Sequence, residues 1–410
     1  MFRWLLIWSF FTLSLAASLL GERALPALSS SALTDLAKMR DSSKNLDASD
    51  PHSHLQKILI PRPPDTENST LVRNYIVSTL RNLKWHIEED SFIESTPYGP
   101  KNFTNVIATK DPEAPRRVVL SAHFDSKYFP FFPQNQFVGA TDSAASCAMM
   151  LDIAETLDPL LDARAKRIEE GDLDPEEDED AAETTLQLIF FDGEEAFRVW
   201  SDIDSIYGAR HLAETWAAAY LPPHPKRRLL SPSTPTTQLS TIEHLVLLDL
   251  LGAAHPLVRS YFPDTAWLFD ALVDAETRLR TAGILDAAVL GRSFFRPRSA
   301  TDNSLGYMGD DHLPFLRRGV SVLHVIAEPF PSVWHTLGDD ATVLDLPTLR
   351  AWNLIFRVFF AEYLGLRPES SKRDEPSPSK RHAPPVKKSD SELTRDSAFI
   401  PELQNTDCES

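Results

Sequence analysis

Four short apolar runs alternate along this chain with segments of helical periodicity. The runs cover 116–126, 185–195, 244–253 and 321–328, and each ends in polar residues. Near-continuous apolar strands are typical of a sheet that is buried on both faces. Two more strands are expected over 85–92 and 103–110, and helices over 69–83, 143–157, 205–220 and 346–366. The alternation predicts an α/β fold, a three-layer sandwich with a central mixed, mostly parallel sheet flanked by helices.

The N-terminus carries a pattern typical of a secretory signal. Arg3 precedes an apolar run from Trp4 to Leu20, with small residues near its end. We therefore expect a signal peptide over 1–20 and a secreted protein. The run is slightly long, so the alternative is an uncleaved anchor that holds the protein on the lumenal side of the ER or Golgi membrane. Two Asn-X-Thr/Ser triplets, at Asn68 and Asn102, are compatible with the secretory route.

Composition divides the rest of the chain into one domain and its flanks. Small and polar residues over 21–50 predict a linker, and 51–366 forms the single catalytic domain. The acidic segment 164–184 and the Pro/Ser/Thr-rich segment 222–237 interrupt the pattern as surface insertions. The tail 367–410 is too polar to bury a core, and we expect it to be disordered.

Charge and cysteine content restrict the partners. The chain has 410 residues, a hydrophobic fraction of 42% and a formal net charge of −18, which argues against nucleic acid as a partner. Its two cysteines are Cys147 and Cys408, and the second lies in the polar tail, so we expect no disulfide between them. The fold must depend on its core and on any bound metal.

Acids and histidines gather where the apolar runs end. In open α/β sheets, sites form at the carboxyl ends of the strands. Taken singly, a histidine there can be a satisfied core residue and Asp142 can cap the following helix. Converging carboxylates and imidazoles are better explained by a divalent metal, and nitrogen and oxygen ligands without a thiol suit an open zinc site. The residues concerned are His123, Asp125, Asp142, Glu194, Glu195, Asp249 and His335.

The pair Glu194-Glu195 follows the strand "LIFF" after two residues, Asp192 and Gly193. Adjacent residues that leave a strand point in different directions. One glutamate can therefore bind a metal while its neighbour stays free beside it, where a carboxylate is placed for general acid/base catalysis. Taken alone, without the other residues, the pair is better explained as part of a solvated loop.

Several blocks closely resemble the glutaminyl-peptide cyclotransferases, or glutaminyl cyclases, which share their fold with zinc-dependent aminopeptidases. The resemblance runs in order from about residue 50 to 366. The blocks that carry it are "HFDSKYFP", "FVGATDSAASCAMML", "LIFFDGEEAFRVWSDIDSIYGARHLA", "LVLLDLLGA" and "DDHLPFLRRGVSVLHVIAEPFPSVWHTLGDD".

The resemblance implies a role for individual residues. It implies that one zinc ion is bound by Asp142, Glu195 and His335, with Glu194 as the acid/base residue. It implies that Asp249 and Asp310 are linked acids beside the site that share a proton or hydrogen bond. It also implies a substrate pocket, formed by Trp200, Phe330 and Trp334.

Two positions depart from the family pattern. Animal cyclases usually have a disulfide between the position of Cys147 and that of Ala122, and an alanine cannot form it. Such a bridge contributes mainly to stability, so the chemistry should persist without it. Gly309 stands where family members often have a polar residue, which leaves substrate handling there open.

Two enzymatic functions fit these residues. The cyclase interpretation is conversion of N-terminal Gln, and more slowly Glu, of peptides to pyroglutamate with release of ammonia. The alternative is a secreted aminopeptidase with two zinc ions, in which His123 and Asp249 supply the further ligands. Trp200 and the blocks "DDHLPFLRRG" and "PSVWHT" favour the cyclase. No ligand is missing, which disfavours a non-catalytic binding protein. We expect a monomer that acts on peptide or protein N-termini and meets a membrane only through an uncleaved anchor.

Overall fold

Successive side chains of the apolar runs face two different helical layers. The computed structural model of this protein describes residues 22–368 except for 24, 172–178, 223–235, 299–305 and 307. In β3 (Arg116–His123), Val118 and Leu120 lie in the larger core cluster, whereas Val119 between them lies in the smaller one. This is the alternation of a strand buried on both faces, and it explains why the runs are apolar at nearly every position.

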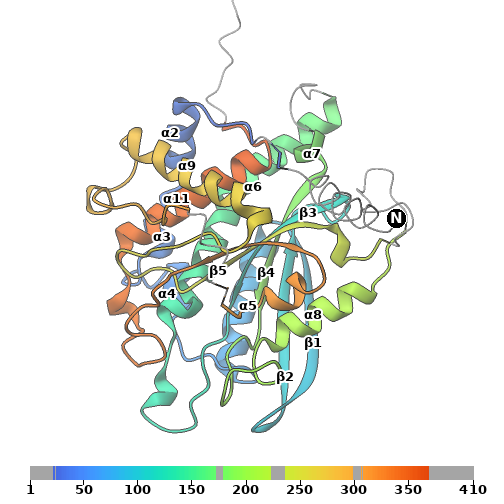
Figure 1. Ribbon diagram of the computed structural model, residues 1–410, viewed down its shortest axis with the longest axis vertical. Coiled ribbons are helices and arrows are strands. Elements are labelled where there is room, and N and C mark those ends of the chain that lie inside the picture. The colour runs from blue at the N-terminus through green and yellow to red at the C-terminus, as the bar shows by residue number, and fades with distance from the viewer. Residues whose placement is uncertain are drawn as a thin grey trace, which may run out of the picture. The chain divides into compact units, whose positions relative to one another are not determined.

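Six strands form one mixed sheet in the order β1-β2-β4-β3-β5-β6 (Figure 1). The hairpin of β1 (His86–Thr96) and β2 (Gly99–Thr109) is antiparallel, and β2 also pairs antiparallel with β4 (Thr184–Phe191). β4, β3, β5 (Ile242–Asp249) and β6 (Ser321–Ile326) are mutually parallel. The four predicted apolar strands are therefore confirmed, and their carboxyl ends meet at one edge of the sheet.

Helices cover both faces of the sheet, which confirms the predicted three-layer sandwich (Figure 1). One face is covered by α6 (Ala145–Glu170), α9 (Ala266–Thr281) and α11 (Leu346–Tyr363), with α5 (Glu67–Asn82) in the same core cluster. The other is covered by α8 (Tyr207–Ala218) and the short α10 (Leu313–Leu316). The four predicted helices match α5, α6, α8 and α11 to within a few residues, except that α6 continues from the predicted end at 157 to Glu170. The long helix α9 is not among the predicted ones.

The expected linker over 21–50 belongs to the folded domain, so that prediction is wrong. The segment forms α2 (Ser30–Lys38) and α3 (Ser43–Leu46), and α4 (His54–Ile58) follows. Leu33, Leu36 and Leu46 are buried in the larger core cluster together with residues of α11. Their few apolar positions are spaced to form one buried face, which the many serines and alanines between them obscure in the sequence.

Several predictions concern residues that the structure does not describe. They are the signal segment 1–20, most of the Pro/Ser/Thr-rich insertion, the tail from 369 and Cys408. The acidic insertion is described only at its ends, where α6 enters it and α7 (Glu179–Ala182) leaves it. Cys147 is buried with a free thiol. Within the described residues, no helix has the length and hydropathy needed to cross a membrane.

Candidate active site

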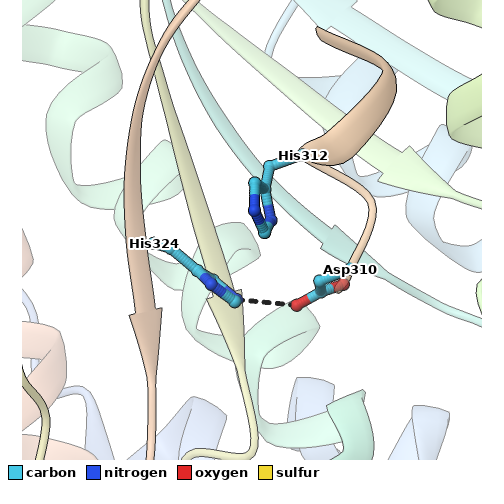
Figure 2. A group of neighbouring side chains, drawn as sticks. All are labelled: Asp310, His312 and His324. Atoms are coloured by element: carbon cyan, nitrogen blue, oxygen red, sulfur yellow. Dashed lines mark hydrogen bonds and ion pairs between the residues drawn. The ribbon is translucent and has the colours of Figure 1, made fainter. Parts of the chain in front are cut away.

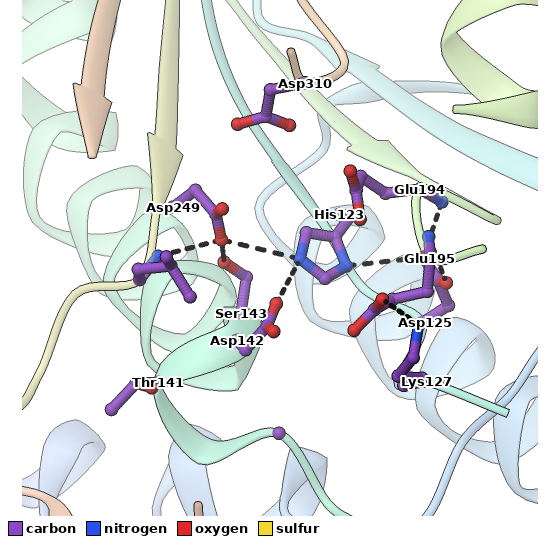
Figure 3. Close-up of polar contacts among 12 residues, drawn as sticks. His123, Asp125, Lys127, Thr141, Asp142, Ser143, Glu194, Glu195, Asp249 and Asp310 are labelled. Carbon is purple, nitrogen blue, oxygen red and sulfur yellow. Dashed lines mark hydrogen bonds and ion pairs between the residues drawn. The ribbon is translucent and has the colours of Figure 1, made fainter. Parts of the chain in front are cut away.

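The carboxyl ends of the parallel strands bring most of the predicted residues together (Figure 3). His123 ends β3 and Asp249 ends β5. Glu194 and Glu195 lie three and four residues beyond Phe191, the last position of β4. All four lie at one edge of the sheet, and each is less than a tenth exposed.

Asp142 is held in an irregular turn before α6. It lies in η2 (Ala140–Ala144), an irregular helical turn in which Asp142 and Ser143 have non-helical backbone angles. Gly139 enters the turn with a φ of 52°, and a Cβ there would lie 2.1 Å from the carbonyl oxygen of Asp142, so only glycine fits. The Thr141 amide and hydroxyl donate to Asp339 Oδ1 at 2.8 and 2.9 Å. These bonds fix the turn that aims Asp142, so its role is not simply to cap the helix.

Asp142, Glu195 and His335 form a group that could hold a metal ion. His335 Nε2 lies 3.2 Å from Glu195 Oε1 and 3.4 Å from Asp142 Oδ2. Both of these carboxylate oxygens are buried and accept no hydrogen bond. Burial lowers the pKa of His335, but the two carboxylates outweigh it and raise the pKa to about 9. Oxygen and imidazole donors that converge without other partners fit a zinc ion.

Two residues without an assigned role in the sequence orient the glutamates. Asp125 accepts hydrogen bonds from the Glu194 and Glu195 amides at 3.1 and 3.3 Å. Lys127 Nζ donates to Glu195 Oε2 at 3.2 Å, so this carboxylate has one oxygen paired and one directed at the metal group. The block "HFDSK" places both beside His123, but their partners lie about seventy residues further on, which the sequence does not reveal.

His123 links Asp142 to a second metal-capable group. His123, Asp142 and Asp249 can each offer a ligand atom within 4.8 Å of the others. Here His123 Nε2 lies 3.0 Å from Asp142 Oδ1, and Ser143 Oγ donates to Asp249 Oδ1 at 2.7 Å. Burial lowers the pKa of His123, but Asp125, Asp142 and Asp249 raise it well above its usual value. His123 and Ser143 therefore supply hydrogen-bond partners to Asp142 and Asp249 on this side of the site.

Glu194 keeps its carboxylate apart from the metal group. Its Oε1 accepts a hydrogen bond from Trp200 Nε1 at 3.1 Å. Burial, and after it the charges of Asp310 and Glu195, raise its pKa well above that of an ordinary glutamate. The two adjacent glutamates thus have different surroundings, as the sequence predicts, and only Glu195 contacts His335.

Asp310 lies beside Glu194 and Asp249 in Figure 3, but the predicted hydrogen bond between Asp249 and Asp310 is not present. Asp310 Oδ2 instead bonds His324 Nε2 at 2.7 Å, with the His312 ring next to His324 (Figure 2). Asp249 bonds Ser143. The two acids still interact electrostatically, because burial and the charge of Asp310 raise the pKa of Asp249 to about 6. They are linked through charge and not through a shared bond.

The three predicted pocket aromatics lie at this site. Trp334 stacks on His335 with ring centroids 3.8 Å apart, and Phe330 packs on Trp334 at 5.0 Å. Trp200 contacts Glu194 through its Nε1 hydrogen bond. A Cβ on Gly309 would lie 2.4 Å from the Trp200 ring, so the glycine leaves the space that this indole occupies. The departure at position 309 therefore serves the placement of Trp200.

Comparison with known proteins agrees with this geometry. The model of Peptidase family M28 matches residues 105–360. A glutaminyl-peptide cyclotransferase of Bos taurus is 44% identical over 317 residues, which cover 76% of this chain and 81% of that protein. The crystal structure of Macrostomum lignano glutaminyl cyclase matches with a TM-score of 0.67 and 36% identity, covering 85% of this chain and 97% of that one. A Zn-dependent exopeptidase from Parabacteroides distasonis, 20% identical, shares the fold with a TM-score of 0.53, covering 83% of this chain and 99% of that one.

Proposed function

The chain belongs to peptidase family M28 and, within it, to the glutaminyl-peptide cyclotransferases, and on this premise we propose that it converts the N-terminal Gln, and more slowly Glu, of peptides to pyroglutamate. Cyclisation of Gln releases ammonia and needs no external nucleophile, because the α-amine of the substrate attacks its own side-chain carbonyl. The reaction is an acyl transfer within one molecule on a peptidase scaffold.

One observation carries the choice of site chemistry. Asp142 Oδ2 and Glu195 Oε1 are buried acceptors without a hydrogen bond, and both belong to the single group that includes His335. A zinc ion bound there would supply Lewis acidity to the side-chain carbonyl of the substrate. In the neighbouring group, Asp142 Oδ1 and Asp249 Oδ1 already have hydrogen-bond partners, His123 Nε2 and Ser143 Oγ. This supports one zinc ion.

Glu194 is the residue that moves the proton. It takes a proton from the α-amine as the nitrogen attacks, and returns it to the departing ammonia. Burial and the acidic neighbours raise the pKa of Glu194, which makes its carboxylate a better proton acceptor than an ordinary glutamate. Trp200 holds its Oε1, which leaves Oε2 for the substrate.

The remaining site residues bind the substrate and its leaving group. Asp249 and Asp310 are placed to accept hydrogen bonds from the nitrogen that is expelled. Trp200, Phe330 and Trp334 enclose the side chain of the first residue and limit the access of water. Exclusion of water strengthens each polar contact in the pocket.

The second candidate, an aminopeptidase, has its own observation. His123, Asp142 and Asp249 form a metal-capable group adjacent to the first, as a two-zinc hydrolase would need. Incubating the purified protein with Gln-Phe-Ala and Leu-Phe-Ala peptides distinguishes the two by mass. Loss of ammonia from the first supports the cyclase, and release of free leucine from the second would overturn it. Metal analysis of the same sample should give one zinc per chain.

The cellular setting is also a proposal. The apolar segment 1–20 and the sequons at Asn68 and Asn102 support secretion, with a lumenal membrane-anchored form as the alternative. The Asn102 side chain is exposed, and an attached glycan would have room there. Recovery of the protein from the medium of expressing cells, with an N-terminus near residue 21, would support this. Retention in the membrane fraction would favour the anchor.

We expect a monomer, which analytical ultracentrifugation would check.

A further inference from the structure

Exposed apolar side chains concentrate in three loops around the active site. Seven of the thirteen large apolar residues that are exposed in the described part of the chain lie within 127–139, 196–206 and 329–338. All three loops follow carboxyl ends of strands, in the lower part of Figure 1. Single exposed apolar residues are ordinary, but a cluster around a site marks a binding surface. The seven are Phe131, Phe132, Val199, Trp200, Ile203, Trp334 and Leu337.

Each loop is attached to the site by a residue already described. Lys127 donates to Glu195, Trp200 donates to Glu194, and Trp334 stacks on His335. An extended chain spans at most about 3.5 Å per residue, so Phe131 lies within about 14 Å of Lys127 and Ile203 within about 11 Å of Trp200. These apolar side chains therefore lie on loops that each begin at or next to a residue of the site.

The first loop presents Phe131 and Phe132 in a fixed conformation. Both side chains are at least three-quarters exposed. The loop is closed by a hydrogen bond from the Asn135 amide to the Phe131 carbonyl at 2.9 Å. Phe129 packs on Phe137 at 5.5 Å, and Phe137 packs on His335. A surface that is ordered before binding loses less entropy when a ligand arrives.

We propose that Phe131, Phe132, Val199, Ile203 and Leu337, here called the apolar rim, bind the substrate peptide beyond its first residue. The proposal rests on the proposed function and adds a substrate class, namely peptides with apolar side chains at the third to fifth positions. With the first residue enclosed by Trp200 and Trp334, the following residues must leave across these loops. An extended peptide advances about 3.4 Å per residue, so its third to fifth residues lie about 7–14 Å from the first. That range is similar to the distance of up to about 14 Å that separates Phe131 from Lys127 at the site.

The test compares Gln-Ala-Leu-Phe-Leu with Gln-Ala-Ser-Ser-Ser. We expect the wild-type protein to favour the first by about tenfold in kcat/KM, which corresponds to about 1.4 kcal/mol. In the double variant Phe131→Gln/Phe132→Gln the ratio should fall to about threefold or less, because two large contacts are lost. Tyr220→Gln is the matched control, since this aromatic is equally exposed but lies beyond the far end of α8. It should leave the ratio unchanged.

Other outcomes would overturn the rim as a peptide site. One is an equal loss on both peptides in the double variant. Another is an unchanged ratio combined with altered self-association or altered binding to phosphatidylcholine vesicles, which would assign the rim to a second copy or to a membrane. Binding of the pyroglutamyl product of the apolar peptide, followed by calorimetry, separates this proposal from the proposed function. A protein that cyclises no peptide contradicts the proposed function. If the pyroglutamyl peptide still binds more weakly to the double variant than to the wild-type protein, the rim is nevertheless supported as a peptide site.

Discussion

Two regions of this protein bury carboxylates to the same degree and treat them in opposite ways. In the helical layer, Asp152 of α6 is fully buried and accepts hydrogen bonds from Arg357 and from Asn45 Nδ2, the latter at 2.8 Å. At the site, Asp311 is also fully buried, but neither of its oxygens has a hydrogen-bond partner. Burial and the neighbouring Asp310 raise the pKa of Asp311 well above its usual value.

The difference separates structural acids from functional ones. A buried carboxylate is costly unless it is paired. In the helical layer, Arg357 of α11 pairs with Asp152 of α6, and this pair holds the two helices together. The site leaves its acids to compete for protons and for a metal, which costs stability but provides groups that change charge during a reaction. The same sequence therefore uses one residue type for two purposes, and substitutions should separate them.

The largest effect is expected at Glu195. Glu195→Gln removes a ligand charge, and we expect loss of both bound zinc and cyclase activity. In Glu194→Gln the metal content should stay the same while kcat falls by about 10²–10⁴-fold, because only the proton transfer is lost. Metal analysis and peptide kinetics on the two variants measure this. Equal loss of zinc in both would mean that the adjacent glutamates share one role.

Substitutions at the Asp152–Arg357 pair of the helical layer should change the stability of the protein and leave its metal content unchanged. Arg357→Ala leaves Asp152 as an uncompensated buried charge, and we expect the free energy of unfolding to fall by about 3–5 kcal/mol. The control is Arg298→Ala, which breaks an exposed pair with Asp270 and should cost at most about 1 kcal/mol. Urea denaturation measures both. Similar losses would show that burial does not distinguish the pairs.

A smaller effect concerns the pH dependence of stability. The folded pKa of Asp249 is about 6, above the usual value for an aspartate, so its contribution to stability is complete at low pH and is lost as the pH rises through 6. Asp249→Asn keeps the acceptor for Ser143 but does not titrate. The stability of wild type relative to this variant should therefore fall by about 1–3 kcal/mol between pH 4 and pH 7, in a denaturation series.

Asp204 offers a control of opposite sign. Burial raises the pKa of Asp204, but hydrogen bonds from the Val199 amide and the Tyr207 hydroxyl outweigh burial and lower it. The stability that Asp204 contributes is present above its unfolded pKa and is lost as the pH falls through the folded one. Relative to Asp204→Asn, wild type should therefore lose stability on acidification. A difference that does not vary with pH in either variant would contradict the assignment.

The parts that follow from periodicity and chain direction could be predicted from the sequence. Apolar runs identify the parallel strands, and their shared direction brings His123, Glu195 and Asp249 to one edge of the sheet. Asp142 and His335 stand beyond the ends of these runs, and the resemblance assigns them to the metal together with Glu195. The partners of Lys127 and Asp310 could not be predicted, because they depend on loop conformations that no repeat or periodicity encodes. The predicted linker over 21–50 is wrong because many small residues separate the apolar residues that form its buried face.

The N-terminal helices have a consequence for how the protein is made. Leu28 donates its amide to Glu362 at 2.7 Å, and Leu33 of α2 shares a core with Trp352 of α11, the last helix of the domain. The helices α2 and α3 therefore cannot complete their core until α11 has been synthesised. Until then their apolar faces stay exposed on the nascent chain, which makes this stage of folding prone to aggregation.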